Sequence, residues 1–173
     1  MAYDFFGIPV GEINVWLIWI LPFAAAMIIP AVGKFSKLST GRVAVAFALM
    51  SAISAATLFP MALEAHEIHH QVMWIDAIGL KAGVLADPLS IIMANVVGWI
   101  SFLIMVYSTG YMKGDKDITR FWFWMLFFIG SMQLIILSDN LLQVFFGWEG
   151  VGLASYALIS FWYHDKKKDH VGQ

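Results

Sequence analysis

The sequence predicts an all-α membrane protein with about five transmembrane helices. Of its 173 residues, 61% are hydrophobic and only 13% are charged, whereas soluble domains average about 45–50% apolar and about 25% charged residues. The mean hydropathy is +0.78. The apolar residues gather in five long runs, and alternating segments of the kind that form a membrane β-barrel do not occur.

The five runs cover residues 13–33, 43–63, 88–112, 121–138 and 140–163. A helix rises about 1.5 Å per residue, so it needs about 20 residues to cross a hydrocarbon core of about 30 Å. The run 121–138 lies at the lower edge of that length, and the others reach it. A buried soluble bundle is disfavoured because soluble helices keep a polar face. We therefore interpret residues 1–173 as a single membrane domain built as a bundle of helices.

Basic residues predict the orientation of this bundle. If the helices alternate across the membrane, all but one of the lysines and arginines fall on one side, which the positive-inside rule assigns to the cytoplasm. The N-terminus and the loop 64–87 are then outside and the C-terminus is inside. We expect no cleaved signal peptide, because the first residues lack a basic segment and a cleavage motif. The residues on the basic side are Lys34, Lys37, Arg42, Lys113, Lys116, Arg120 and Lys166–Lys168, and Lys81 is the exception.

The loop 64–87 contains two different patterns. Its first part, "EAHEIHH", holds His66, His69 and His70. If the preceding helix continued, His66 would share a face with His69 or His70, three or four residues further on, a spacing that can chelate zinc. The alternative, which we favour, is a solvated helix end with interfacial histidines. The second part has glycines between apolar residues and predicts a short extended hairpin on the membrane surface. Asp87 and Pro88 then predict the start of the third helix, with Asp87 as its cap.

Glu149 is the one carboxylate inside the five runs. If the fifth helix begins at Asn140, Glu149 lies about 14 Å along it, near the middle of the membrane. An ionised carboxylate there costs at least about 2.5–3.5 kcal/mol, so such residues are rare and usually functional. Glu149 is therefore a candidate proton-transfer residue. The alternative is a structural glutamate that hydrogen-bonds a neighbouring helix.

Small residues follow the same helix at spacings of three and four. In lipid, such residues let two helices approach closely, and glycines otherwise weaken a helix by about 1 kcal/mol each. We expect the packing around the acid to involve Gly147, Gly150, Gly152, Ala154, Ser155 and Tyr156.

The segment "DNLLQVFFGWEGVGLASYALISFW" resembles the fifth-helix signature of the largest antiporter-like subunit of respiratory complex I, a family that includes archaeal deazaflavin-dependent relatives. In this sequence "GWEGVG" occupies 147–152 and "SY" occupies 155–156. Upstream, "DPLSIIMANVVGWISFLIMVYSTGYM" and "KGDKDITRFW" are similar to the third helix and the following loop of that family. The resemblance is colinear from about Ala86 onward, and the first two helices match in pattern only. It implies that the chain is the N-terminal part of an antiporter-like helical bundle.

The resemblance implies a role for Glu149, which matches the membrane-embedded acid of the family. There the acid pairs with a lysine on a later helix, but no lysine lies within the five runs of this chain. The implied partners are further helices that supply membrane lysines, other membrane subunits of a complex I-like assembly, and the lipid bilayer. The implied function is proton translocation coupled to electron transfer to quinone or a similar acceptor. The alternatives are a subunit of a multisubunit sodium/proton antiporter and a truncated structural scaffold.

Several kinds of chemistry are not supported. The sequence has no cysteine, so thiolate metal sites, iron–sulfur clusters and disulfides cannot form from this chain alone. We expect no redox cofactor on it, because it has no cysteine and its histidines lie outside the five runs. We expect no catalysis by the chain alone, because neither a phosphate-binding loop after a strand nor a nucleophile triad occurs. We also expect no nucleic-acid partner. The expected location is a prokaryotic cell membrane.

Overall fold

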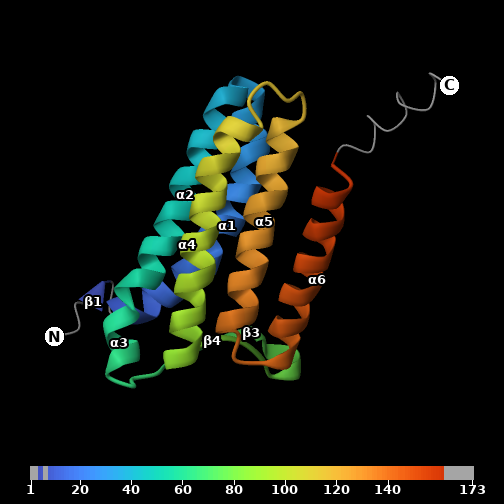
Figure 1. Ribbon diagram of the computed structural model, residues 1–173. Helices are drawn as coiled ribbons and strands as arrows, with labels where there is room; N and C mark the ends of the chain where they lie inside the picture. Colours follow the sequence, from blue (N-terminus) through green and yellow to red (C-terminus); the bar gives the residue numbers. More distant parts are fainter. Residues whose placement is uncertain (1–3, 6–7, 162–173) are drawn as a thin grey trace.

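Five long helices form the body of the protein in the computed structural model, which describes residues 4–5 and 8–161 (Figure 1). By length and composition, each of the five could cross a membrane. They correspond to the five apolar runs predicted from the sequence. The long helices are α1 (Val10–Phe35), α2 (Lys37–Thr57), α4 (Pro88–Tyr111), α5 (Ile118–Leu137) and α6 (Leu141–Ile159), and a short helix, α3 (Phe59–Leu63), follows α2.

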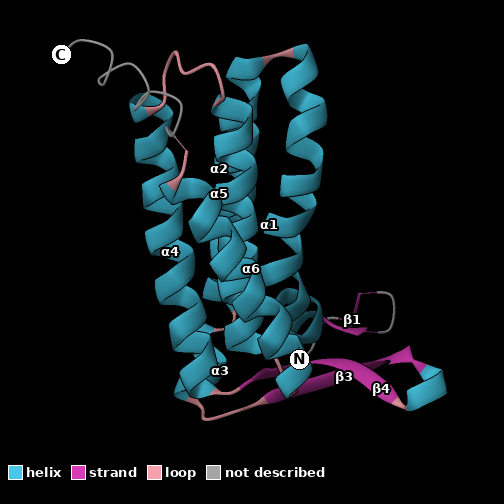
Figure 2. Ribbon diagram, turned by 90° about the vertical axis from the view of Figure 1, so that its right-hand side faces the viewer, coloured by secondary structure: helices cyan, strands magenta, loops and turns pink. Residues whose placement is uncertain are grey.

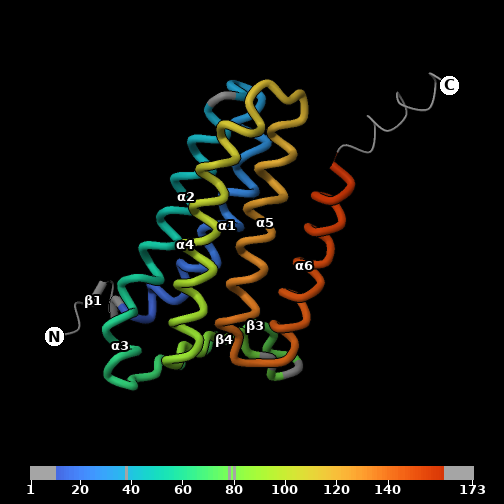
Figure 3. Tube along the Cα trace, viewed as in Figure 1, coloured from blue at the N-terminus to red at the C-terminus, as the bar shows by residue number. Residues whose placement is uncertain are grey.

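Helix α5 is the centre of the arrangement. It packs against α1, α2 and α4 on one side and against α6 on the other. Figure 3 shows α6 beyond α5, away from α2 and α4. The buried apolar residues form two clusters, one toward each end of the bundle, and α6 contributes no described residue to either of them. The first cluster includes Val15, Ile18, Leu58, Ile91 and Leu137, and the second includes Ala25, Ile29, Met105, Trp122 and Leu126.

Capping side chains fix where the helices begin. The Asp87 carboxylate accepts a hydrogen bond of 2.7 Å from the backbone N–H of Ser90, which confirms the predicted cap of α4. Asn140 caps α6 in the same way, through a 3.0 Å bond from the N–H of Gln143. Each cap gives an acceptor to an N–H that has no partner within the helix.

The second predicted run, 43–63, is not one continuous helix. Helix α2 ends at Thr57, and the chain restarts as α3 at Phe59. The physical reason is Pro60, which has no N–H to donate to the carbonyl four residues earlier and whose ring crowds that carbonyl.

The loop between α3 and α4 contains an antiparallel hairpin, which was predicted for its second part. The hairpin begins earlier, at Ile68, so the prediction of a solvated helix end at His69 and His70 is wrong: both lie on a strand that pairs with the second half of the loop. Strand β3 (Ile68–Ile75) pairs with β4 (Leu80–Ala86), and a short 3₁₀ turn (Asp76–Ile78) joins them. Gly79 ends this turn with a φ of 65°, which favours glycine. Figure 2 shows the hairpin lying across one end of the helices. A second, very short pair, β1 (Asp4–Phe5) with β2 (Ile8–Pro9), precedes α1 and was not predicted.

The basic loops meet at the opposite end of the bundle. The Lys37 ammonium donates a 3.0 Å hydrogen bond to the backbone carbonyl of Lys116, which joins the α1–α2 turn to the α4–α5 loop. Lys81 lies on β4 at the hairpin end. The structure thus separates the basic residues of these loops from Lys81, as alternating helices require. The predicted basic run Lys166–Lys168 lies outside the described residues.

Candidate functional site: a carboxylate on the open face of helix α6

One face of α6 is used for close packing against α5. Gly147, Gly150 and Ala154 are buried there. A Cβ added at Gly147 would lie 2.6 Å from Cγ1 of Ile135 and 3.0 Å from the carbonyl oxygen of Ser131, and one added at Gly150 would collide with the Ser131 hydroxyl. The two backbones therefore approach as closely as the missing side chains allow.

Gly152 and Tyr156, two of the other predicted packing residues, do not lie in this contact. A Cβ at Gly152 would meet no atom within 4 Å, and the side chain of Tyr156 is 73% exposed. Ser155 is half-buried. Gly152 therefore faces away from α5 in the described part of the chain, and its packing around Glu149 stays a prediction.

Glu149 lies on the open face of α6. It is exposed, and the large apolar side chains beside it are exposed as well, with Phe145 at 53% and Trp148 at 70%. Within residues 8–161, no hydrogen bond joins Glu149 to another side chain, and no cationic group lies within ion-pair distance of it. The Glu149 carboxylate therefore lies on an apolar surface. In the described residues it has no side-chain hydrogen bond and no ion pair.

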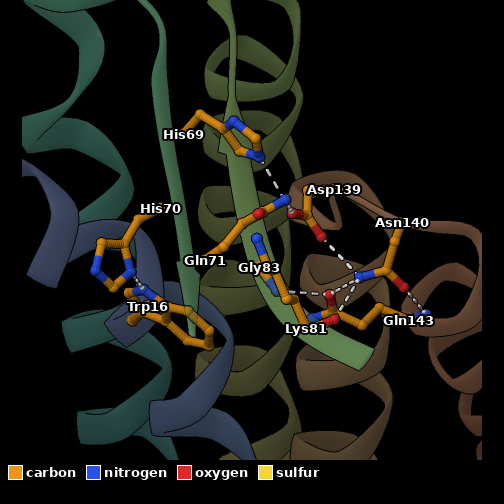
Figure 4. A network of polar contacts seen from close by, with 9 residues as sticks. All are labelled: Trp16, His69, His70, Gln71, Lys81, Gly83, Asp139, Asn140 and Gln143. Carbon is orange, nitrogen blue, oxygen red and sulfur yellow. Dashed lines mark hydrogen bonds and ion pairs between the residues drawn. The ribbon is translucent and has the colours of Figure 1, made fainter. Parts of the chain in front are cut away.

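A polar network holds the start of α6, and sequence reasoning missed it (Figure 4). Asp139, in the turn between α5 and α6, has a side chain only 2% exposed. Its carboxylate accepts hydrogen bonds of 2.7 Å from Gln71 and 2.7 Å from Asn140, and it lies 3.2 Å from the ring of His69. Burial alone would raise the pKa of Asp139, but these bonds and the charge of His69 outweigh it and hold the pKa below its ordinary value.

The same network attaches strand β4 to α6. The amide oxygen of Gln143 accepts a 2.8 Å hydrogen bond from the backbone N–H of Gly83, and Asn140 donates to the carbonyl oxygen of Lys81 at 3.3 Å. A side chain at Gly83 would collide with the Asp139 carboxylate. Glycine at this position therefore lets the hairpin reach the turn before α6.

The histidines do not form the zinc site considered from the sequence. That alternative required the helix to continue, but β3 begins at Ile68, so His69 and His70 point to opposite faces of a strand. His69 faces Asp139, whereas His70 accepts a 3.1 Å hydrogen bond from the indole of Trp16. His66 lies 3.8 Å from Glu64. In the part of the chain that the structure describes, no three histidines or carboxylates gather as metal ligands.

The fold and the site define a class of protein: a multi-helix membrane protein with a carboxylate near the middle of its last described helix. Residues 73–122 match the family model described as NADH-ubiquinone oxidoreductase (complex I), chain 5 N-terminus. The chain is 40% identical to NADH-quinone oxidoreductase subunit L of Rickettsia bellii over 152 residues, which cover 85% of this chain and 24% of that protein. It belongs to the subunit L/chain 5 family of complex I, and it matches the N-terminal portion.

Other relatives agree with this assignment. Subunit L of Mycobacterium tuberculosis (strain H37Rv) is 38% identical over 162 residues, which are 89% of this chain and 25% of that protein. NADH-ubiquinone oxidoreductase chain 5 of Dictyostelium discoideum is 36% identical over 149 residues, which are 83% of this chain and 22% of that protein. The chain thus spans about a quarter of the length of the curated relatives that it matches.

Proposed function

We propose that the chain is the N-terminal portion of a proton-translocating membrane subunit in a complex I-like quinone oxidoreductase, with Glu149 as its proton-transfer residue. The observation that carries this proposal is the position of Glu149 on the open face of α6, opposite the face that packs against α5. The names of the relatives, NADH-quinone oxidoreductase subunit L and NADH-ubiquinone oxidoreductase chain 5, support the parent complex.

The open face is where a partner for the carboxylate would dock. We propose that further helices cover this face and bring a lysine toward Glu149. A cation nearby favours the ionised carboxylate, and withdrawal of the cation in an apolar setting favours the protonated form. The site can then take up and release one proton in each cycle. Moving a unit charge across the membrane is worth about 2.3 kcal/mol per 100 mV, so the cycle requires energy from electron transfer.

The same proposal includes an orientation and partners. The end with the α1–α2 turn and the α4–α5 loop faces the cytoplasm of a prokaryotic cell, and the hairpin end faces outward. The other membrane subunits of the complex contact the surface of α6. The separation of the basic loops from Lys81 supports this orientation.

The test replaces Glu149 with Gln, which keeps size and most hydrogen bonding but cannot ionise. The matched control is Glu67→Gln, the same chemical change at an exposed residue outside the spanning helices. Proton uptake is measured in vesicles containing the assembled complex and normalised to complex content. We expect uptake to fall strongly in Glu149→Gln, to be partly retained in Glu149→Asp, and to be unchanged in Glu67→Gln.

Two results would count against this function. Wild-type uptake by Glu149→Gln would show that the acid is structural. Proton flux that requires sodium but no electron donor would favour the sodium/proton antiporter instead.

A further inference from the structure

A cavity of about 590 Å³ opens at the basic end of the bundle. It lies between the start of α2 and the loop that joins α4 to α5, and we call it the basic cavity. Four cationic side chains line it, and the apolar groups of Ile118 and Trp122 form part of its wall. The four cations are Lys37, Arg42, Lys113 and Lys116.

These cations are not neutralised by carboxylates in the described part of the chain. None of the four lies in an ion pair there. The hydrogen bond from Lys37 goes to a backbone carbonyl, which carries no net charge. One carboxylate, Asp115, lines the same cavity and accepts a 2.8 Å bond from the N–H of Asp117. A concave surface with an excess of positive charge attracts anions, because the field is focused inside it.

The wall of the cavity contains a buried donor without an acceptor. Trp122 is fully buried, and its indole N–H has no hydrogen-bond partner in the described structure. The indole lies against Gly41, where an added Cβ would be 3.3 Å from the ring nitrogen. Buried donors are nearly always paired in native proteins. An oxygen-rich ligand that enters beside Gly41 would supply the missing acceptor.

The surroundings of the cavity fit a lipid better than a free anion. The cavity lies at the ends of helices that are long and apolar enough to cross a membrane. In a membrane crossed by these helices, that position is the depth of phospholipid headgroups. Thr109 lines it from α4, and below Thr109 on the same helix Val106 and Leu103 are 43% and 63% exposed. An acyl chain can lie along these apolar side chains while its headgroup occupies the cavity.

We propose that the basic cavity binds the phosphate-bearing headgroup of an anionic phospholipid. The ordinary explanation of these cations is the positive-inside rule, which places lysines at this end without requiring a site. Lys34 is explained by that rule alone, since it is exposed at the same end but does not line the cavity. Basic pockets between transmembrane helices on the cytoplasmic side are suited to anionic headgroups, and this step rests on the orientation proposed above. The proposal does not depend on the role of Glu149.

The test measures retention of labelled phosphatidylglycerol by the affinity-purified chain with the subunits that accompany it, in mild detergent. We expect Lys113→Gln to weaken retention about fivefold, the effect of one basic residue near a headgroup, and Lys34→Gln to change it less than twofold. Thr109→Phe should weaken retention without changing any charge, because it fills the cavity. Glu149→Gln should retain the lipid as the wild type does.

Three outcomes would overturn the proposal. Equal losses in Lys113→Gln and Lys34→Gln would show a diffuse surface potential rather than a site. Displacement of the lipid by millimolar inorganic phosphate would show a site for the free anion. Equal retention of labelled phosphatidylcholine would show that the apolar groove alone holds the lipid.

Discussion

The contact between α5 and α6 should tolerate no added carbon at Gly147. In Gly147→Ala, the new Cβ would lie 2.6 Å from Cγ1 of Ile135, 3.0 Å from the carbonyl oxygen of Ser131 and 3.2 Å from the backbone nitrogen of Ile135. Two of these three atoms belong to the backbone, so rotation of a side chain cannot relieve the clash. Overpacking of this kind costs about 1–3 kcal/mol.

Gly152→Ala is the matched control, because its Cβ would meet nothing within 4 Å. Both substitutions gain the same helix propensity, about 1 kcal/mol, so this gain cancels in a comparison between them. We therefore expect Gly147→Ala to be about 1–3 kcal/mol less stable than Gly152→Ala.

The assay is unfolding of the purified chain in mixed micelles with increasing sodium dodecyl sulfate, followed by tryptophan fluorescence. The free energy of unfolding is compared for the two variants and the wild type. If Gly147→Ala were as stable as Gly152→Ala, the two helices would not be in the close contact described here.

Three further predictions concern the hairpin, the orientation and the cap of α4. Asp139→Asn should lower the free energy of unfolding by about 1–3 kcal/mol at pH 6. Because the pKa of Asp139 is held below 3.8 in the folded protein, its stabilising effect is present above that pH and is lost as the pH falls through the folded-state pKa, so the two proteins should converge. Cysteines at Lys34 and Lys81 should react with an impermeant thiol reagent from opposite sides of the membrane, Lys34 from the cytoplasm. Asp87→Ala should cost about 1 kcal/mol of stability, measured by the same unfolding assay, because it removes the cap of α4.

Each of these predictions has its own control. A constant difference between wild type and Asp139→Asn from pH 6 to pH 3 would contradict the role assigned to its ionised form. Labelling of both cysteines from one side would contradict alternating spans. Asp87→Ser keeps a capping oxygen and should be close to wild type, so an equal loss in both Asp87 variants would show that the cap contributes little.

The sequence was informative wherever a property depends on local pattern. Apolar length predicted the five spanning helices, and Asp87 predicted the start of α4 because capping acts within three residues. Of the small residues on α6, Gly147, Gly150 and Ala154 lie on its buried face. Gly152 follows Gly147 by five residues and so lies about 140° around the helix. The packing of these residues around Glu149 stays a prediction.

The polar network could not be predicted in the same way, because its members come from distant parts of the chain. Gln71 and Asp139 are 68 residues apart in sequence, and Gly83 and Gln143 are 60 apart. Such pairs depend on how the hairpin lies across the bundle, which no local pattern specifies. The histidine segment was interpreted as a helix end, so the strand alternation that turns His69 and His70 to opposite faces was not predicted. The role of Glu149 stays a prediction.

The hairpin contacts both the first and the last of the described helices, so its two sets of contacts become available at different times during synthesis. Its contact with α1, between His70 and Trp16, uses residues that the ribosome makes before or with the hairpin. Its contacts with Asp139 and Gln143 use residues made more than fifty positions later than the hairpin's Gly83 and Gln71. The nascent hairpin can therefore be anchored on one side only while α4 and α5 enter the membrane. Its second set of contacts can form only after Asp139 and Gln143 have been synthesised. The hairpin is therefore fully docked only once the start of α6 is in place.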